Sequence, residues 1–217
     1  MRIFVGYDEN ESIGFHVCTQ SLIRNSSKPV SITALGGNKR DGSNNFTYDR
    51  FLVPYLCDFK GWALWIDGAD MLVLGDVNEI KPPELGCAVY VVKHDYKTKH
   101  PRKYVGTSIE ADNSDYPRKN WSSVILWDCG HYMNKWLYPS FINEHDGSYL
   151  HRFGWLPDER VGELPIEWNW LADEYGENEE AKILHWTAGI PGFTHYAHTP
   201  HAPLWRQYAR HVVRGLA

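Results

Sequence analysis

Short apolar runs separated by polar turns open the chain and predict strands that alternate with a helix. Arg2–Gly6 is the first such run, and residues 30–35 form the second. Between them, residues 11–24 place apolar side chains near one side at helical spacing. Because parallel strands need a crossover connection, which is usually a helix, these three elements indicate a βαβ unit in a parallel sheet.

Two further apolar runs surround an acidic turn within residues 61–76. Trp62–Ile66 has the bulky apolar side chains of a buried strand, and the sequence DGAD at residues 67–70 follows it directly. Two carboxylates at the end of a core strand are costly to bury unless a positive group lies between them. Mg²⁺ or Mn²⁺ would meet that need, whereas a plain hairpin turn is the alternative interpretation of Asp-Gly.

The rest of the chain predicts further strands and short helices around the same sheet. Apolar runs that predict strands lie at residues 86–92, 121–127 and 182–186. Residues 47–59 predict an amphipathic helix that is kinked or shortened at Pro54, and residues 203–216 predict an amphipathic C-terminal helix. Residues 155–163 are acidic and rich in turn-forming residues. Two polar stretches, 36–45 and 97–120, are expected to be loops, and the second is either a mobile loop over a site or a solvated one.

Composition describes a soluble globular protein of one ordinary domain. Of 217 residues, 43% are hydrophobic and 23% charged, and the net charge of −5 argues against nucleic acid as a partner. No apolar run is long enough to span a membrane, and residues 1–11 lack a signal peptide's apolar core, so a cytoplasmic protein is expected. The C-terminal helix, rich in arginine, would make at most a peripheral membrane contact.

The four cysteines are widely spaced and never form CxxC, which argues against a zinc site or a disulfide framework. They are expected to be reduced core residues. The signatures HExxH, GxSxG, GxGxxG and the P-loop are also missing from the sequence. Zinc proteases, serine hydrolases, Rossmann oxidoreductases and P-loop NTPases therefore lack support.

Polar residues at the expected carboxyl ends of strands are candidate site residues, because ligands of parallel sheets bind at that edge. Tyr7, Asp8 and Asn10 follow the first strand, where they would hold a nucleotide base and ribose or, in the case of Asp8 and Asn10, cap the helix. Arg50 would pair with the acidic turn, clamp a phosphate or form a surface salt bridge. His185 ends the last apolar strand as a metal ligand or a structural histidine.

Five segments, in chain order, carry a resemblance to a known family. They are FTYDRFLVPYL (46–56), ALWIDGADMLVLGDV (63–77), WSSVILWDCGH (121–131), LPIEWNWL (164–171) and ILHWTAGIPG (183–192). The chain resembles the GT-A glycosyltransferases over residues 2–195, in particular family 8-like enzymes and their small bacterial and viral relatives. The resemblance implies an α/β fold, with one GT-A type domain over residues 1–217 and a mostly parallel central sheet flanked by helices. Residues 1–95 would form the donor-binding half, and residues 96–217 the acceptor side with the last metal-ligand strand.

The resemblance also implies a metal and a donor. Asp67 and Asp70 are similar to the family's DxD carboxylates, and His185 is similar to its late histidine ligand; together they would hold Mn²⁺ or Mg²⁺ against the diphosphate of a nucleotide-diphospho-sugar, a UDP-sugar by resemblance. The turn with Tyr7, Asp8 and Asn10 would contact the base. Arg50 and Asp67 would lie near the phosphates and sugar of the donor.

The same resemblance implies three catalytic candidates. Glu159, beside Asp158, falls where the family often has the Asp of an Asp-Gln pair that contacts the donor sugar, and Asn169 lies in the neighbouring Trp-Asn segment. Family 8 enzymes retain the anomeric configuration, which implies a retaining hexosyl transfer here. An inverting enzyme would need a carboxylate base near the acceptor, for which Asp128, Asp158 and Glu163 are ambiguous candidates.

The sequence departs from the family pattern at three points. The acidic motif is one residue longer than DxD, Glu159-Arg160 stands in place of Asp-Gln, and the closing phosphate-binding lysine is absent, so that residues 97–102 or Arg118 would replace it. The expected function is metal-dependent transfer of a sugar to a glycan or a lipid-linked sugar. A non-catalytic nucleotide- or sugar-binding module is the first alternative. A nucleotidyltransferase is the second, although no glycine-rich loop follows the first strand.

Overall fold

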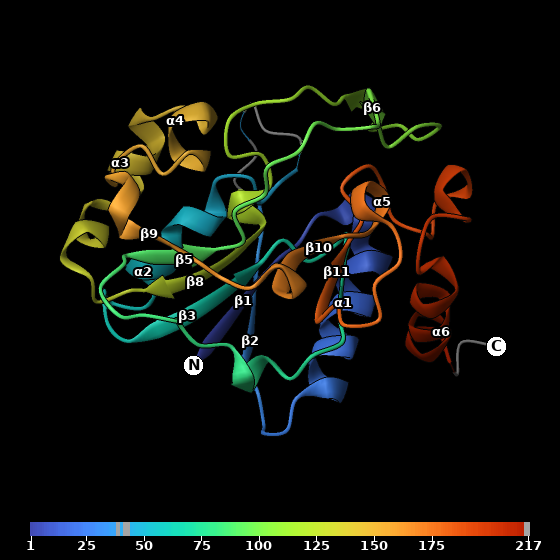
Figure 1. Cartoon of the computed structure of the whole chain (residues 1–217), viewed down its shortest axis with the longest axis horizontal. Coiled ribbons are helices and arrows are strands. Elements are labelled where there is room, and N and C mark those ends of the chain that lie inside the picture. The colour runs from blue at the N-terminus through green and yellow to red at the C-terminus, as the bar shows by residue number, and fades with distance from the viewer. Residues whose placement is uncertain (38–39, 41–43, 215–217) are drawn as a thin grey trace.

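A computed structural model describes residues 1–37, 40 and 44–214 and shows helices packed around a six-stranded sheet (Figure 1). The strand order is β2-β1-β3-β8-β5-β9. The strands are β1 (Arg2–Gly6), β2 (Ile32–Leu35), β3 (Trp62–Ile66), β5 (Val89–Val91), β8 (Val124–Asp128) and β9 (Val161–Glu163). Only β8 is antiparallel to its neighbours, so the sheet is mostly parallel, as the sequence predicts.

The predicted βαβ unit is present at the start of the chain. Helix α1 (Ser12–Asn25) connects β1 to β2, and these two strands pair in parallel. The helix lies directly on the acidic turn, because a Cβ atom on Gly14 would be only 1.9 Å from the carbonyl oxygen of Ala69. Gly68 has φ +94°, and a Cβ there would meet the carbonyl oxygen of Gly6 at 2.5 Å. The turn is therefore fixed between β1 and α1 by two close backbone approaches.

A second, three-stranded sheet places a late segment of the chain, around residue 185, beside this turn. Its order is β10 (Trp170–Leu171), β11 (Ile183–His185) and β4 (Met71–Val73). Strand β11 runs antiparallel to β4, with His185 paired to Met71. This register places His185 beside Asp70, although 114 other residues separate them in sequence.

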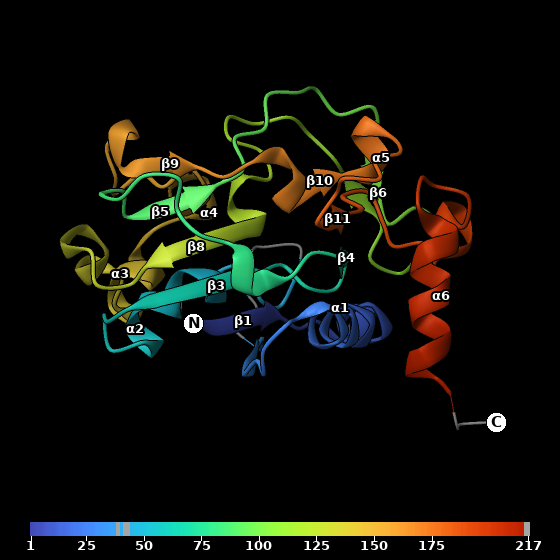
Figure 2. The same ribbon diagram turned by 60° about the horizontal axis from the view of Figure 1, so that its bottom comes forward.

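Alternating residues of the large sheet face two cores. Phe4, Trp65 and Trp127 face the core under α2 (Val53–Leu56), α3 (Pro139–Glu144) and α4 (Gly147–His151). Ile3 and Leu64 face the opposite core, which contains residues of α1 and the small sheet. A third cluster joins α1 and the small sheet to α6 (Ala202–Val212). Figures 1 and 2 show α2 and α3 at one end of the sheet and α1 and α6 at the other.

Several sequence expectations need correction at the level of local structure. Residues 47–59 form a 3-10 helix, Asp49–Leu52, followed by α2, and Pro54 lies in the first turn of α2, where a missing N–H costs nothing. Helix α2 therefore begins beside Pro54, at Val53, and it ends at Leu56, before the expected end at residue 59. The strand expected at residues 121–127 begins only at Val124, because Trp121–Ser123 is a 3-10 turn. The turn-rich segment 155–163 ends in the edge strand β9.

Other expectations agree with the structure where it describes the chain. The four cysteines are free thiols, and three of them are buried. No helix in the described ranges is long and apolar enough to cross a membrane. The C-terminal helix expected at residues 203–216 is present but ends earlier than expected, at Val212. Residues 215–217 lie outside the described residues, as do residues 38–39 and 41–43 of the polar loop expected at 36–45.

Candidate active site

A polar pocket of about 120 Å³ lies where β3 ends and β8 begins, at the carboxyl edge of the parallel strands. Its walls come from distant parts of the chain. They are segment 44–50, the acidic turn 67–70, residues 103–123, His151 at the end of α4, and residues 185–187 after β11. The pocket is where the resemblance would place a ligand, and Arg50, Asp67, Asp70 and His185 all line it.

Asp67 is engaged by the protein itself. The Arg50 guanidinium lies 2.5 Å from Asp67 Oδ1, and Trp65 Nε1 donates to the same oxygen at 3.0 Å. Arg50 in turn donates to the carbonyl oxygens of Thr47 and Ser122 at 3.0 and 2.8 Å. Burial raises the pKa of Asp67 above its usual range, while Arg50 opposes that shift. Arg50 and Asp67 thus form a buried, multiply bonded ion pair in the pocket wall.

Asp70 is only partly engaged. Its Oδ2 lies 3.2 Å from His185 Nε2, and its Oδ1 is buried with no hydrogen-bond partner in the described structure. His185 Nδ1 lies 2.9 Å from Asn169 Oδ1, and Asn169 Nδ2 donates to the carbonyl oxygen of Asn120 at 3.2 Å. This second bond fixes the orientation of the Asn169 amide, so its Oδ1 can only accept, and His185 Nδ1 must carry a proton. His185 Nε2, which faces Asp70, therefore carries a lone pair in the neutral ring or a proton in the cationic ring.

The charge of Asp70 acts on His185. Burial alone lowers the pKa of His185, but the carboxylates of Asp70, Asp67 and Asp173 together outweigh burial and raise it above the usual range, with Asp70 contributing most. A divalent cation beside Asp70 would supply positive charge in place of the proton on His185 Nε2. The hydrogen bond from Nδ1 to an amide oxygen is the arrangement that orients histidine ligands of metals.

The residues present fit a divalent cation with few protein ligands. Asp70 Oδ1 and His185 Nε2 are available, whereas Asp67 is held by Arg50. No group of three or more His, Cys, Asp or Glu side chains in the described ranges is arranged to hold a metal. Mg²⁺ and similar ions commonly use one or two carboxylates and complete their shell with substrate phosphates and water. The donor set therefore suits an ion that arrives with a phosphate ligand.

The turn after β1 does not line the pocket. Asp8 Oδ1 accepts hydrogen bonds from the backbone and side-chain nitrogens of Asn10 at 2.9 and 2.8 Å, and its Oδ2 accepts from the backbone of Asn45 at 2.8 Å. Asp8 thus caps the 3-10 helix Glu9–Glu11. Tyr7 is exposed, and its ring meets the edge of Phe15.

Asp158 and Glu159 also lie outside the pocket. They precede β9, which runs parallel to β5 and β3. They therefore lie at the amino end of these strands, whereas the acidic turn follows the carboxyl end of β3. Asp158 is exposed and pairs with Arg118. Arg118, one of the expected replacements for the missing lysine, is therefore occupied there. Of the three catalytic candidates, the structure brings only Asn169 to the site, as the partner of His185.

Two ionisable residues near the pocket, Lys103 and Glu11, were not predicted from the sequence. Lys103 lines it, one residue beyond the stretch 97–102 that was expected to supply a cation. Glu11 is 1% exposed, with Oε1 unpaired, and burial, followed by Asp70 and Asp8, raises its pKa well above the usual range. The basic run around residue 100 signals the lysine, but nothing in the sequence distinguishes Glu11 from a residue of the first helical turn.

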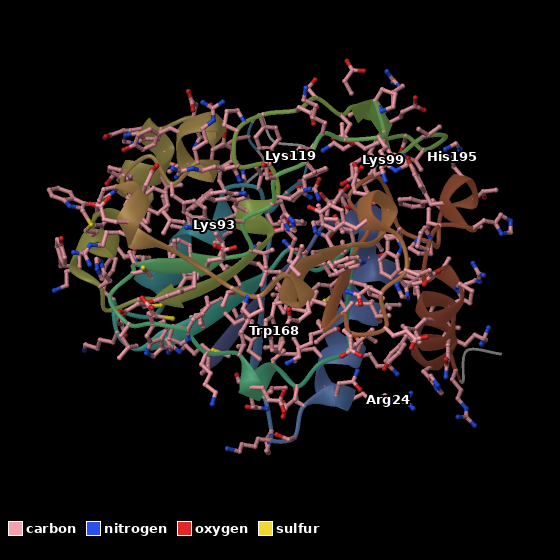
Figure 3. All side chains as sticks on the ribbon, in the orientation of Figure 1. Arg24, Lys93, Lys99, Lys119, Trp168 and His195 are labelled. Atoms are coloured by element: carbon pink, nitrogen blue, oxygen red, sulfur yellow. The ribbon has the colours of Figure 1, made fainter. Side chains whose placement is uncertain are left out.

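Residues 97–120, hereafter the covering loop, arch over the pocket (Figure 1). The loop is tied down, because Lys99 bonds the buried Glu174 through both its backbone and side-chain nitrogens at 2.9 and 2.5 Å. Tyr104, which lines the pocket, donates its backbone N–H to Ala188 at 2.7 Å. Figure 3 shows Lys99 and Lys119 along this loop. Part of this loop therefore lines the pocket, and hydrogen bonds hold it to the segments around residues 174 and 188.

A sequence relative establishes the family. Protein CDI from Arabidopsis thaliana is 38% identical to this chain over 222 residues, covering 94% of the chain and 84% of the relative. The chain belongs to the Protein CDI family. No protein-family model matches the sequence of this family member.

Solved structures establish the fold of this Protein CDI relative. WbbM, a bifunctional glycosyltransferase, matches 96% of the chain with a TM-score of 0.61 and 15% identity. The chain spans only 49% of WbbM. LgtC, a galactosyltransferase solved in complex with donor and acceptor sugar analogs, matches 96% of the chain and 95% of its own length, with a TM-score of 0.60 and 14% identity. The predicted GT-A glycosyltransferase fold is therefore confirmed.

Proposed function

We propose that this chain transfers a sugar from a nucleotide-diphospho-sugar, a UDP-sugar, to a hydroxyl group of a glycan or lipid-linked sugar, with Mn²⁺ or Mg²⁺ as cofactor. The observation that carries the proposal is the buried, unpaired Asp70 Oδ1 beside an oriented His185, in a polar pocket of a GT-A fold. An unpaired buried carboxylate oxygen is costly, and a bound cation would remove that cost.

The roles of the metal-site residues follow from their contacts. Asp70 and His185 would hold the cation, and Asn169 would keep the His185 ring oriented toward it. When bound, the cation would neutralise the charge that develops on the diphosphate leaving group. Asp67 would contribute through Arg50, whose guanidinium it holds in the pocket wall.

The remaining positive charge comes from the covering loop. Lys103 lines the pocket, and we assign it to the donor phosphates in place of the absent family lysine. Burial lowers the pKa of Lys103, and the nearby Asp70 carboxylate opposes that shift. Tyr7, Asp8 and Asn10 would meet the base only at the outer edge of the site, since none of them lines the pocket.

The pocket must enlarge to admit a donor. Its volume of about 120 Å³ is well below the range of about 300–1,000 Å³ usual for small-molecule sites. The covering loop supplies Lys103, Tyr104 and Tyr116 to the lining, so its displacement is the simplest route to a larger site. When the loop closes again over the donor, it would exclude water from the reacting centre.

We further propose that the transfer retains the anomeric configuration. An inverting transfer needs a base near the acceptor, and none of Asp128, Asp158 and Glu163 lines the pocket. The anomeric proton of the transferred sugar in the glycoside product, observed by NMR, tests this point directly. An inverted product would contradict it.

The test of the function is calorimetric titration of nucleoside diphosphates and UDP-sugars with and without Mn²⁺. We expect binding that Mn²⁺ strengthens, and we expect Asp70→Ala to remove that strengthening. Glu180→Ala, which deletes an exposed carboxylate near β11, is the matched control and should behave as wild type. Binding that ignores both Mn²⁺ and Asp70→Ala would refute the metal-assisted mechanism.

A non-catalytic binding module remains the competing function, favoured by the small number of free metal ligands. It predicts nucleotide binding without turnover. Release of UDP from a bound UDP-sugar, measured with and without candidate acceptors, separates the two functions. Sustained UDP release that depends on Mn²⁺ excludes the module.

A further inference from the structure

A histidine that the metal site does not use also lines the pocket. His151 ends α4, and its Nδ1 lies 2.7 Å from the hydroxyl oxygen of Ser122. The ring packs edge-on against Phe51 at a centroid distance of 5.2 Å. Ser122 itself is nearly buried, and its carbonyl oxygen accepts a hydrogen bond from Arg50. The imidazole is therefore held in one orientation from two sides.

The surroundings keep this imidazole neutral. Burial lowers the pKa of His151 well below its usual range, and the positive charges of Arg50 and Lys103 lower it further. A neutral imidazole has one donor and one acceptor nitrogen and carries no charge with which to attract a phosphate. Its partner in the pocket is thus expected to be a neutral polar group.

The Ser122–His151 pair can present either kind of hydrogen bond. When the Ser122 hydroxyl donates to Nδ1, the proton of the ring is on Nε2, which then donates. When the Ser122 oxygen accepts from Nδ1–H, Nε2 is free to accept. A sugar hydroxyl group both donates and accepts. An imidazole backed by a serine hydroxyl can satisfy it in either direction.

The neighbours of the pair are also suited to a sugar. Asn120, Ser123 and Tyr116 line the same pocket with uncharged hydrogen-bonding groups. Among the described residues, the pair is hydrogen-bonded to a charged side chain through the bond from Arg50 to the Ser122 carbonyl. We propose that the Ser122–His151 pair binds a hydroxyl group of the sugar that is transferred, and so contributes to donor selectivity. This inference rests on the proposed function.

The experiment compares donors with and without the sugar. With Mn²⁺ present, UDP and the sugars UDP-glucose, UDP-galactose and UDP-N-acetylglucosamine are titrated into wild type and His151→Phe. We expect His151→Phe to weaken the best-bound UDP-sugar about tenfold, the effect of one lost hydrogen bond to a buried partner, and to leave UDP unchanged. His151→Gln, which keeps a polar group at the Nε2 position, should recover part of the loss.

A second variant and modified donors guard against a general loss of structure. Ser122→Ala removes the hydroxyl but keeps the backbone carbonyl that binds Arg50, so its UDP affinity should also be unchanged. For wild type, one deoxy analogue of the best UDP-sugar should bind more weakly. His151→Phe should not distinguish that analogue from the parent sugar.

Two results would overturn this inference without contradicting the proposed function. The first is equal affinity of wild type and His151→Phe for every UDP-sugar while UDP binds normally. The second is an equal loss for UDP and UDP-sugar, which would assign His151 to the phosphates or to the fold. Failure of wild type to bind any of these nucleotides would instead refute the proposed function, and the inference with it.

Discussion

The two carboxylates of the acidic turn are three residues apart and line the same pocket, but their surroundings differ. Asp67 is paired with Arg50 at 2.5 Å and accepts a further bond from Trp65. Asp70 leaves one buried oxygen without a partner, and its other oxygen faces a histidine that Asn169 orients. The protein thus satisfies one carboxylate itself and leaves the other available. Identical residue types in one turn thus have different hydrogen-bond partners because different elements pack against them.

The difference follows from which parts of the chain reach each carboxylate. The 3-10 helix that begins at Asp49 brings Arg50 to Asp67, whereas β11 brings His185 to Asp70. Both contacts are long-range in sequence. The longer spacing of this acidic motif, DxxD, is therefore accommodated by giving the two aspartates separate partners.

Removing Arg50 tests the role of Asp67, the carboxylate that the protein pairs itself. This substitution should have the largest effect, a loss of unfolding free energy. Arg50→Met leaves Asp67 buried without its cation, which costs about 3–5 kcal/mol of unfolding free energy for a broken buried pair. The loss should be smaller at low pH, where Asp67 takes up a proton. Urea denaturation at two pH values measures both effects.

The control for Arg50 is a second substitution at its partner. Asp67→Asn in the Arg50→Met background removes the stranded charge while keeping an acceptor for Trp65, so most of the stability should return. A loss below about 1 kcal/mol in Arg50→Met would show that the pair contributes little.

Substituting Asp70 tests the carboxylate that has an oxygen without a partner. For this residue, Mn²⁺-dependent UDP binding should change more than the free energy of unfolding. Asp70→Asn is expected to lower the Mn²⁺-dependent gain in UDP affinity about 100-fold, since a charged ligand becomes a neutral one. Its unfolding free energy should stay within about 1 kcal/mol of wild type, because the side chain keeps its size. Calorimetry with and without Mn²⁺ checks the first value, and urea denaturation checks the second.

Asn169 sharpens the comparison because it contacts His185, which in turn faces Asp70. Asn169→Leu removes the acceptor for His185 Nδ1, and the loss of such an orienting partner typically lowers metal affinity about 10–100-fold. Binding of UDP without Mn²⁺ should be unaffected. An equal fall in UDP affinity with and without the metal would instead assign Asn169 to the nucleotide.

Periodicity and turn chemistry were enough to predict the strands that carry the site. Trp62–Ile66 is a strand with the predicted bounds, and the βαβ unit at the start of the chain is present. The edge strand β9 was missed because three residues in a turn-rich segment have no period of their own. Pro54 was interpreted as a helix breaker because only the structure reveals where the helix begins.

The candidate site was less predictable, because its contacts join segments far apart in the chain. Arg50, Asp67, Asp70 and His185 were proposed from their places at strand and helix ends, and the structure brings them to one pocket. His151 carried no signal, because it ends a five-residue helix that periodicity hardly marks. Glu159 was assigned through the family resemblance, which places it by its order along the chain. The direction of β9 takes Glu159 to the other end of the sheet, and sequence spacing does not contain that information.

Glu11 adds a third carboxyl to the comparison, and its expected effect is the smallest. Asp67 is paired with an arginine, whereas burial and the charges of Asp70 and Asp8 raise the pKa of Glu11 well above its usual range, which favours its protonated form. A carboxyl group with a raised pKa in the folded state binds more protons there than in the unfolded chain. Stability should therefore fall as the pH rises from the unfolded pKa toward the folded one.

Glu11→Gln should remove this fall, because the amide has the shape of the protonated acid and does not titrate. Each unit by which the pKa is raised corresponds to about 1.4 kcal/mol, so the variant should match wild type near pH 4 and become more stable than wild type as the pH rises. Urea denaturation across that range measures the difference. A stability difference between Glu11→Gln and wild type that stays the same at every pH would contradict a raised pKa of Glu11 in the folded protein.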